Sequence, residues 1–238
     1  MSARTPTNPR GLRDLPFSVE AATPSERART RRLLRALDEA YPDAHCELDY
    51  TEPHELVIAT ILSAQATDAG VNKATPKLFE AFPTPADYAA SSPKGIEPYI
   101  RTIGLFRNKA KHVHGAMTRV VEEFGGDVPD NVEDLLSLPG VARKTAGVVL
   151  GNAFGINDAF VVDTHVMRLA VRLGLVEAGT TVAMTERRLM ALIPRDRWCD
   201  ASHLLIWHGR RACPARGNTG EHPICRRFGG ACACKENA

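Results

Sequence analysis

Apolar residues recur at helical spacing along most of this chain, and short breaks at proline and glycine separate the helical segments. Continuous β-branched runs are scarce, and the clearest strand candidate, Phe160 to Val162, is too short to build a sheet. We therefore predict an all-α fold of about ten helices without an internal repeat. The clearest apolar faces comprise Leu56, Ile58, Ala59, Ile61 and Leu62 in one segment, and Val113, Met117, Val120 and Val121 in another.

Composition and breaks divide the chain into segments. Residues 1–22 are rich in Pro, Thr, Arg and Ser without periodicity, which predicts a flexible N-terminal tail. The first helix is expected at Thr23-Pro24-Ser25-Glu26, where Thr caps, Pro stands first and Glu folds back. We expect a helical subdomain over 23–128 that forms one domain together with a region over 129–202, followed by a C-terminal segment over 203–238.

The charge balance limits how this chain can bind nucleic acid. Its net charge is only +2, so any nucleic-acid surface must be a local patch. The stretch from His203 to Ala238 is the most basic, with six basic residues against two acidic ones. No apolar run approaches the roughly 18 to 20 residues of a membrane span, and the N-terminus lacks the apolar core of a signal peptide. We therefore expect a cytoplasmic protein without a membrane partner.

Two predicted helices are joined by a hairpin at Pro139-Gly140. Asp130 or Asn131 caps the first helix, and the second begins at about Ala142. A hairpin of this kind exposes backbone N–H groups at a helix N-terminus, which bind a DNA phosphate without reading sequence. We therefore predict phosphate contacts at Gly140, Ala142 and Arg143.

Lys144 falls in the first turn of the second hairpin helix. The positive end of the helix dipole and the neighbouring Arg143 both disfavour an ammonium group, which predicts a lowered lysine pKa. A neutral lysine is a nucleophile that forms Schiff bases with sugar carbonyl carbons. On position alone, an exposed helical lysine without a chemical role is the competing interpretation.

Asp163 lies nineteen residues after Lys144, between an apolar run and another amphipathic segment. It is placed to cap that helix. A carboxylate also accepts a proton or stabilises an oxocarbenium-like sugar as a base leaves, and the two roles are compatible. His165 and Arg168 are interpreted as structural or phosphate-contacting residues.

Together these motifs resemble the signature of endonuclease III, in the helix-hairpin-helix superfamily of DNA glycosylases. The hairpin with its lysine and spaced aspartate is the specific part of this pattern, and the resemblance extends over roughly Glu26 to Cys234. The matching stretches are Leu138 to Ala146 with Val162 to His165 for the signature, Leu62 to Asp68 with Val71 to Thr75 for the first motif block, and Gly104 to Ala110 for the DNA-wedge loop.

The resemblance implies a bifunctional DNA glycosylase and AP lyase acting on double-stranded DNA, with residues 23–202 as the glycosylase domain. Lys144 would attack the deoxyribose anomeric carbon, expel an oxidised pyrimidine and form an imine, after which β-elimination cuts the strand. Asp163 would assist base departure from a flipped-out nucleotide. Gln65 would fill the space left in the duplex, and Leu105 would be the apolar wedge beside it.

One residue of the hairpin departs from the family pattern. Ala142 stands where the family usually has a second glycine, so a positive φ or a close backbone approach would meet a Cβ. The sequence therefore predicts weaker phosphate binding at this hairpin.

Four cysteines, Cys213, Cys225, Cys232 and Cys234, fall in the last 26 residues. In a reducing compartment such a cluster indicates a metal centre, either a four-iron, four-sulfur cluster or zinc. The resemblance implies the 4Fe-4S cluster, although the intervening lengths of eleven, six and one residues differ from the family's six, two and five. His222 falls where the family's second cysteine would, so it is an alternative ligand in place of Cys234.

The cluster would hold a basic loop against DNA. Candidate phosphate contacts near it are Arg210, Arg211, Arg216, Arg226 and Arg227. Because nothing in the sequence indicates an oligomer, we expect a monomer associated with the nucleoid.

Four other functions compete with this interpretation. Monofunctional relatives such as the mismatch adenine glycosylase lack a lysine at the position of Lys144, so its presence argues against that function. A pure binding module would have lost that lysine or Asp163, and both are present. A ferredoxin-like carrier would leave most of the chain without a purpose. A specialised paralogue that acts mainly as an AP lyase or as a DNA-binding module is the alternative that stays open.

Overall fold

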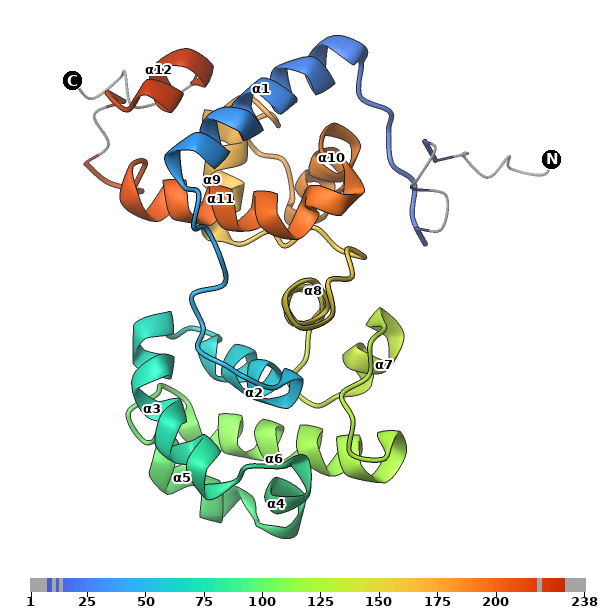
Figure 1. Cartoon of the computed structure of the whole chain (residues 1–238), viewed down its shortest axis with the longest axis vertical. Coiled ribbons are helices and arrows are strands. Elements are labelled where there is room, and N and C mark those ends of the chain that lie inside the picture. Colours follow the sequence, from blue (N-terminus) through green and yellow to red (C-terminus); the bar gives the residue numbers. More distant parts are fainter. Residues whose placement is uncertain (1–7, 10–11, 13–14, 218–219, 230–238) are drawn as a thin grey trace, which may run out of the picture. The chain divides into compact units, whose positions relative to one another are not determined.

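The computed structural model describes residues 8–9, 12, 15–217 and 220–229, and within them the chain is helical without a strand (Figure 1). The predicted all-α class is confirmed, and Phe160 to Val162 belongs to no helix or strand. None of the described helices is long and apolar enough to span a bilayer. The α-helices are α1 (Pro24–Ala40), α2 (Pro53–Ser63), α3 (Asp68–Ala81), α4 (Pro85–Ala90), α5 (Pro93–Ile100), α6 (Phe106–Phe124), α7 (Val132–Ser137), α8 (Arg143–Val149), α9 (Thr164–Arg172), α10 (Val182–Leu192), α11 (Trp198–Arg211) and α12 (Pro223–Phe228), with a π-helical turn at Leu150–Phe154 and a 3-10 turn at Arg195–Arg197.

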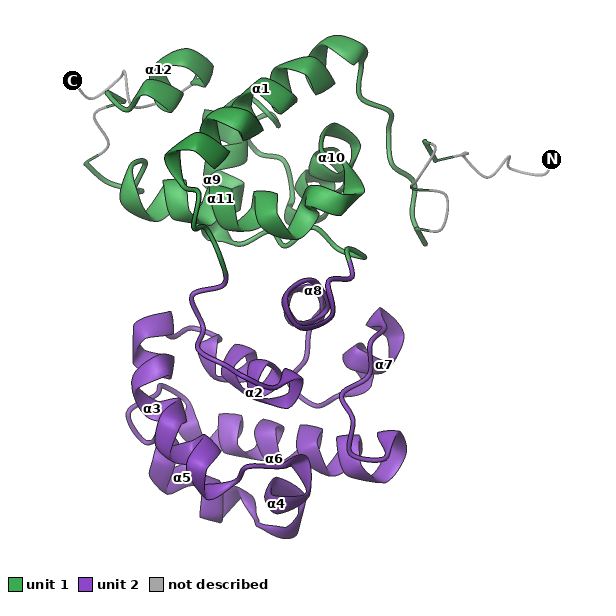
Figure 2. Ribbon diagram, viewed as in Figure 1, with its two compact units in different colours: residues 1–45, 157–238 green, residues 46–156 purple. Residues whose placement is uncertain are grey.

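The chain forms two compact units, and one of them is discontinuous in sequence (Figure 2). Unit 1 comprises Met1–His45 and Asn157–Ala238, whereas unit 2 comprises Cys46–Ile156. The segments predicted over 23–128, 129–202 and 203–238 follow chain order. The units do not, because α1 packs with the C-terminal helices α11 and α12.

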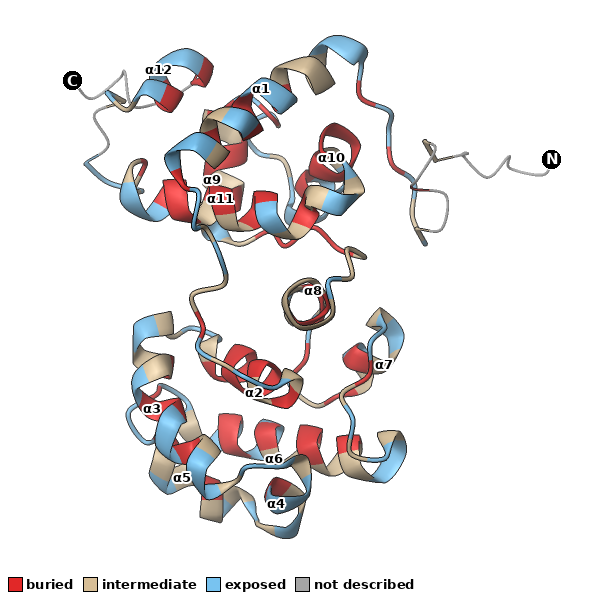
Figure 3. Ribbon diagram, in the orientation of Figure 1, coloured by how far each residue is buried: buried red, intermediate tan, exposed pale blue. Residues whose placement is uncertain are grey.

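Unit 2 is built around α2, which packs against α3, α6 and α8. The predicted apolar face of α2 is buried, and so are Val57 and Thr60 on its other sides (Figure 3). A helix that is apolar all round must be enclosed by neighbours. On α6, Val113, Met117 and Val120 are buried as the helical spacing predicts. The central position of α2 fixes where its C-terminal end, and the loop after it, emerge from the unit.

Unit 1 buries α1, α9, α10 and α11 against one another around Leu37 and Trp198. The capping box predicted at the start of α1 is present, with Thr23 and Glu26 bonded reciprocally. Arg29 of α1 donates hydrogen bonds of 2.8 Å to the carbonyl oxygens of Leu173 and Phe228. This arginine therefore ties α1 to the segment after α9 and to the last residue of α12.

Part of the segment predicted to be a flexible N-terminal tail packs into the core of unit 1. The Asn8 side chain donates to the carbonyl oxygens of Leu12 and Phe17 and accepts from the Val19 N–H. Leu12, Val19 and Ala22 are buried in the same core as α1. Among the described residues of 1–22, this segment is therefore held by a local asparagine network and apolar contacts.

Candidate DNA-repair site

The hairpin forms between α7 and α8 at the predicted residues. Of the two candidate caps, Asn131 is the one that caps α7, and its side chain accepts a 2.9 Å hydrogen bond from the Asp134 N–H. The turn after α7 closes with a 3.1 Å hydrogen bond from the Val141 N–H to the Leu138 carbonyl oxygen. The α8 helix then begins at Arg143, so its N-terminal end lies directly after the hairpin turn.

Gly140 is the residue of this turn that must lack a side chain. Its φ is +82°, and a Cβ built on it would lie 2.8 Å from the His112 Cβ. Ala142, by contrast, has an extended backbone with φ −97° and ψ 170°. The positive φ considered for this position is therefore not present, and the alanine carries no backbone strain of that kind.

We expect Gly140→Ala to lower the free energy of unfolding by roughly 2 to 4 kcal/mol, because left-handed strain and overpacking add. Urea unfolding at equilibrium measures this loss. Gly126→Ala is the matched control in the same unit, since Gly126 has φ +98° and no atom within 4 Å of its built Cβ. Equal losses in the two variants would mean that the His112 contact contributes nothing.

Lys144 is the second residue of α8, and its side chain is exposed. Arg143 precedes it at the first helical position. The lysine therefore stands at the positive end of the helix dipole, as predicted. This placement leaves the amine accessible to a ligand at the N-terminal end of the hairpin helix.

Asp163 caps α9 in unit 1. Its Oδ1 accepts a 2.7 Å hydrogen bond from the Val166 N–H, which confirms the predicted capping role. The side chain is half-buried, so the cap fixes the carboxylate while leaving it partly accessible. With Oδ1 engaged, Oδ2 is the oxygen that remains to interact with a substrate.

Arg168 and His165 hold α9 to the end of α11. Arg168 donates to the carbonyl oxygens of Gly209 and Cys213, at 2.8 and 3.1 Å, and lies 3.1 Å from His165 Nδ1. A Cβ on Gly209 would lie 3.1 Å from both side chains. These contacts give Arg168 the structural role that the sequence allowed, while the phosphate contact of His165 stays a prediction.

Gln65 and Leu105, the predicted gap-filling and wedge residues, share an unusual backbone conformation. They are the two non-glycine residues with positive φ in the described part of the chain, at +54° and +58°. Both are exposed, Leu105 with 61% of its surface accessible. Large L-residues seldom adopt this conformation, and strain of this kind concentrates at functional sites. Sequence patterns could not have revealed the strain, because neither residue is Gly or Asn.

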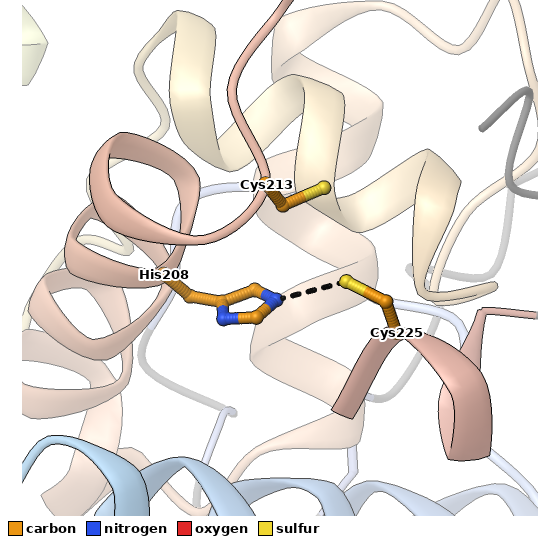
Figure 4. Close-up of side chains that lie close together, drawn as sticks. All are labelled: His208, Cys213 and Cys225. Carbon is orange, nitrogen blue, oxygen red and sulfur yellow. Dashed lines mark hydrogen bonds between the residues drawn. The ribbon is translucent and has the colours of Figure 1, made fainter. Parts of the chain in front are cut away.

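Three buried side chains of unit 1 bring metal-binding atoms together (Figure 4). The His208 imidazole and the thiols of Cys213 and Cys225 all lie within 4.8 Å of one another. His208 Nε2 is 3.4 Å from Cys225 Sγ. The other two predicted cysteine ligands, Cys232 and Cys234, lie outside the described residues. His208 was missed in the sequence, where it occupies an apolar helical stretch and reads as an ordinary core histidine.

His222 does not join this group of donor atoms. Its Nδ1 accepts a 3.3 Å hydrogen bond from the Ile224 N–H, so it caps α12. Its ring lies 4.9 Å from the His208 ring, measured between centroids, and stacks on Tyr41. Within the described residues, the histidine beside the two cysteines is therefore His208.

The surroundings favour the metal-binding form of two of these donors, Cys213 and His208. The hydrogen bond with Cys213, together with burial, raises the pKa of Cys225, so that thiol stays protonated. A hydrogen bond from Cys225 lowers the pKa of Cys213 to about 6, and the Arg172 guanidinium, 3.2 Å from its sulfur, acts in the same direction. Burial, with a smaller contribution from His222, lowers the pKa of His208 to about 4, so the imidazole is neutral at pH 7. The Tyr41 hydroxyl lies 2.8 Å from His208 Nδ1 and orients the ring. A thiolate at Cys213 and a neutral imidazole at His208 are ready to bind a metal, and Cys225 would release its proton on binding, so these residues fit a metal centre.

Five arginines in the segment around this group are exposed, whereas Arg172 beside Cys213 is half-buried. Arg211 lies over the Trp207 ring, 3.4 Å from its centroid, which holds the guanidinium at the end of α11. The exposed arginines of this region are Arg210, Arg211, Arg216, Arg226 and Arg227. They concentrate basic charge in this segment of the chain, as the near-neutral net charge requires of a local nucleic-acid surface.

Comparison with known proteins identifies the family to which this fold belongs. The family model described as "HhH-GPD superfamily base excision DNA repair protein" matches residues 58–195. Endonuclease III of Synechocystis sp. is 49% identical over 201 residues, covering 84% of this chain and 89% of that protein. Two solved structures also align with this chain. A non-covalent endonuclease III–DNA complex has a TM-score of 0.82 and 40% sequence identity, and the match covers 88% of this chain and 97% of that one. A trapped endonuclease III–DNA covalent intermediate has a TM-score of 0.80 and 41% sequence identity, and the match covers 85% of this chain and 94% of that one. The chain belongs to the endonuclease III family of this superfamily.

Proposed function

We propose that this protein removes oxidised pyrimidines from duplex DNA and then cleaves the strand at the abasic site. The observation that carries the proposal is the exposed lysine in the first turn of the hairpin helix, in a chain of the endonuclease III family. The trapped covalent complex of a 41% identical relative shows that such a protein forms a covalent bond with DNA. Lys144 is the residue to which we assign this bond.

In the proposed reaction, the Lys144 amine forms a bond to the sugar anomeric carbon as the bond to the base breaks. The departing base takes up one of the two amine protons. The ring oxygen takes up the other as its bond to the anomeric carbon breaks, which leaves a ring-opened imine. Abstraction of a proton from the adjacent sugar carbon then expels the 3′ phosphate by β-elimination. We assign assistance of base departure to Asp163, whose Oδ2 is not used by the cap.

The target nucleotide must first leave the duplex, at a cost of a few kcal/mol. We assign Gln65 to the space it leaves and Leu105 to the adjacent base step. The amides at Gly140 and Ala142, with Arg143, would hold a phosphate, and His165 is a further phosphate contact in this proposal. The partner is double-stranded DNA, and we place a monomer at the nucleoid in the cytoplasm.

We propose a 4Fe-4S cluster as the metal centre, held by Cys213, Cys225, Cys232 and Cys234. The support is the buried pair of the first two thiols, with Arg172 donating to one and His208 beside the other. When bound, the cluster would cross-link the segment after α11 to α12, through Cys213 and Cys225, and would take no part in the excision step. His208 and Tyr41 then orient and support the donor set from within unit 1.

We expect Cys225→Ser to lose most of its iron and sulfide and the visible absorption of the cluster, and to bind DNA more weakly. Elemental analysis of the purified protein, including zinc, measures the first effect. Cys199→Ser is the control, because Cys199 lies outside the group of donor atoms. A wild-type protein that carries one zinc and no iron would contradict the cluster and leave a zinc site.

The function is tested by borohydride trapping of the wild-type protein on two duplexes, one with thymine glycol and one with a plain abasic site. Covalent complexes on both substrates support the proposed function. Trapping on the abasic duplex alone would leave the second candidate, an AP lyase. Binding without trapping on either duplex would leave a DNA-binding module.

A further inference from the structure

The loops that carry Gln65 and Leu105 are joined by a buried lysine, Lys109. Only 4% of Lys109 is exposed, although it stands in the first turn of α6 directly after the exposed Arg107 and Asn108. Its Nζ donates a 2.9 Å hydrogen bond to the Leu62 carbonyl oxygen at the end of α2. Lysine is almost never fully buried without a partner, and the Leu62 carbonyl oxygen is the partner of Lys109.

The Leu62 carbonyl needs a partner because α2 ends there. In a continuing helix the Ala66 N–H would donate to this carbonyl. Here it donates to the Ser63 carbonyl oxygen instead, at 3.0 Å. Leu62 is fully buried, so water does not replace the missing donor. The Lys109 ammonium supplies it, and a cation is also favoured at the negative end of a helix dipole. Lys109 therefore caps α2 from another helix.

The same residue also holds the other loop. The Lys109 backbone N–H donates a 3.1 Å hydrogen bond to the carbonyl oxygen of Leu105, the left-handed residue that starts α6. Its side chain thus reaches the α2 end three residues before Gln65, and its backbone closes the turn at Leu105. The two strained residues lie forty positions apart in sequence and are connected through one residue, by its side chain on the α2 side and by its backbone on the α6 side.

We propose that Lys109 is a positioning residue that holds the Gln65 and Leu105 loops in fixed relation, so that both side chains enter the duplex together. This inference rests on the proposed function, because it gives those two residues their role in DNA. Because both residues already hold their unusual backbone conformation, little further conformational entropy is lost when the nucleotide leaves the stack. Lys109 itself does not touch the DNA.

The test compares Lys109→Met, which keeps the length of the side chain and removes its donors, with Lys111→Met. Lys111 is exposed on the same helix and is the matched control. Two single-turnover rates are measured for each protein: excision of thymine glycol from a duplex, and borohydride trapping on a single-stranded abasic oligonucleotide, which has no stack to fill. The excision rate divided by the trapping rate does not depend on the folded fraction of the preparation.

We expect Lys109→Met to lower this ratio roughly ten- to a hundredfold, because misplacing a positioned group by about 1 Å costs that much. Lys111→Met should leave it unchanged. In a Gln65→Ala, Leu105→Ala background, Lys109→Met should have little further effect, because the groups it positions are gone. An unchanged ratio, or an equal effect in that background, would overturn the inference.

A separate signal distinguishes this inference from the proposed function. A 2-aminopurine placed opposite a stable abasic analogue reports insertion into the stack by its fluorescence, without any reaction. If the wild-type protein traps on no substrate, the proposed function fails, and this signal still decides the role of Lys109. A wild-type fluorescence change that Lys109→Met retains in full overturns the inference, whereas its loss supports it.

Discussion

Lys144→Gln should lower the rate of covalent trapping at least roughly a thousandfold, the scale of losing a catalytic nucleophile. The reason is that no other group of the hairpin can form the imine, since Arg143 stays protonated. The side chain is exposed, and glutamine is nearly as good a helix former as lysine, so the free energy of unfolding should hardly change. Single-turnover trapping on the thymine glycol duplex measures the rate, and urea unfolding at equilibrium measures the free energy of unfolding.

Lys94→Gln is the matched control for this substitution. Lys94 is also the second residue of a helix, α5, and is also exposed, so it carries the same change in charge and the same helix position. Its trapping rate should equal that of the wild type. Base release by Lys144→Gln at the wild-type rate, without strand cleavage, would contradict the proposal and identify water as the nucleophile.

Local patterns predicted the features of this fold that depend on neighbouring residues. The capping boxes and caps at Thr23, Asn131 and Asp163 are contained within four consecutive residues, and all three are present. The burial of α2 follows equally from its continuous apolar run. By contrast, the pairing of α1 with the C-terminal helices depends on contacts across more than a hundred residues. Periodicity along the chain carries no information about that pairing.

Within the site, the residues that sequence reasoning missed are those whose role depends on packing. His208 and Tyr41 are separated by 167 positions and meet only because α1 lies against α11. Lys109 likewise looks like one polar residue of an amphipathic helix, and its bond to Leu62 spans 47 positions. The motifs therefore identified the groups proposed for the chemistry. The side chains that hold them in place required the folded structure.

Asp163→Asn should lower the rate of base excision by roughly 10² to 10⁴, the usual loss when a proton-transferring group is removed. The fold should be unaffected, because Asn caps a helix as well as Asp does and its amide oxygen can accept the Val166 N–H. Asp163→Ala should lose the same activity and, in addition, about 1 kcal/mol of stability with the cap. Single-turnover excision and urea unfolding of the two variants separate catalysis from capping.

Thr181→Ala supplies the control for capping alone. Thr181 caps α10 in the same unit through a 3.3 Å hydrogen bond from the Met184 N–H, and no chemistry is assigned to it. It should lose stability as Asp163→Ala does and retain the wild-type excision rate. On a preformed abasic site, where no base has to leave, Asp163→Asn should be affected less than on thymine glycol. Equal losses on the two substrates would contradict a role in base departure, because the preformed abasic site has no base to release. Asp163 would then be assigned to the elimination step or to DNA binding.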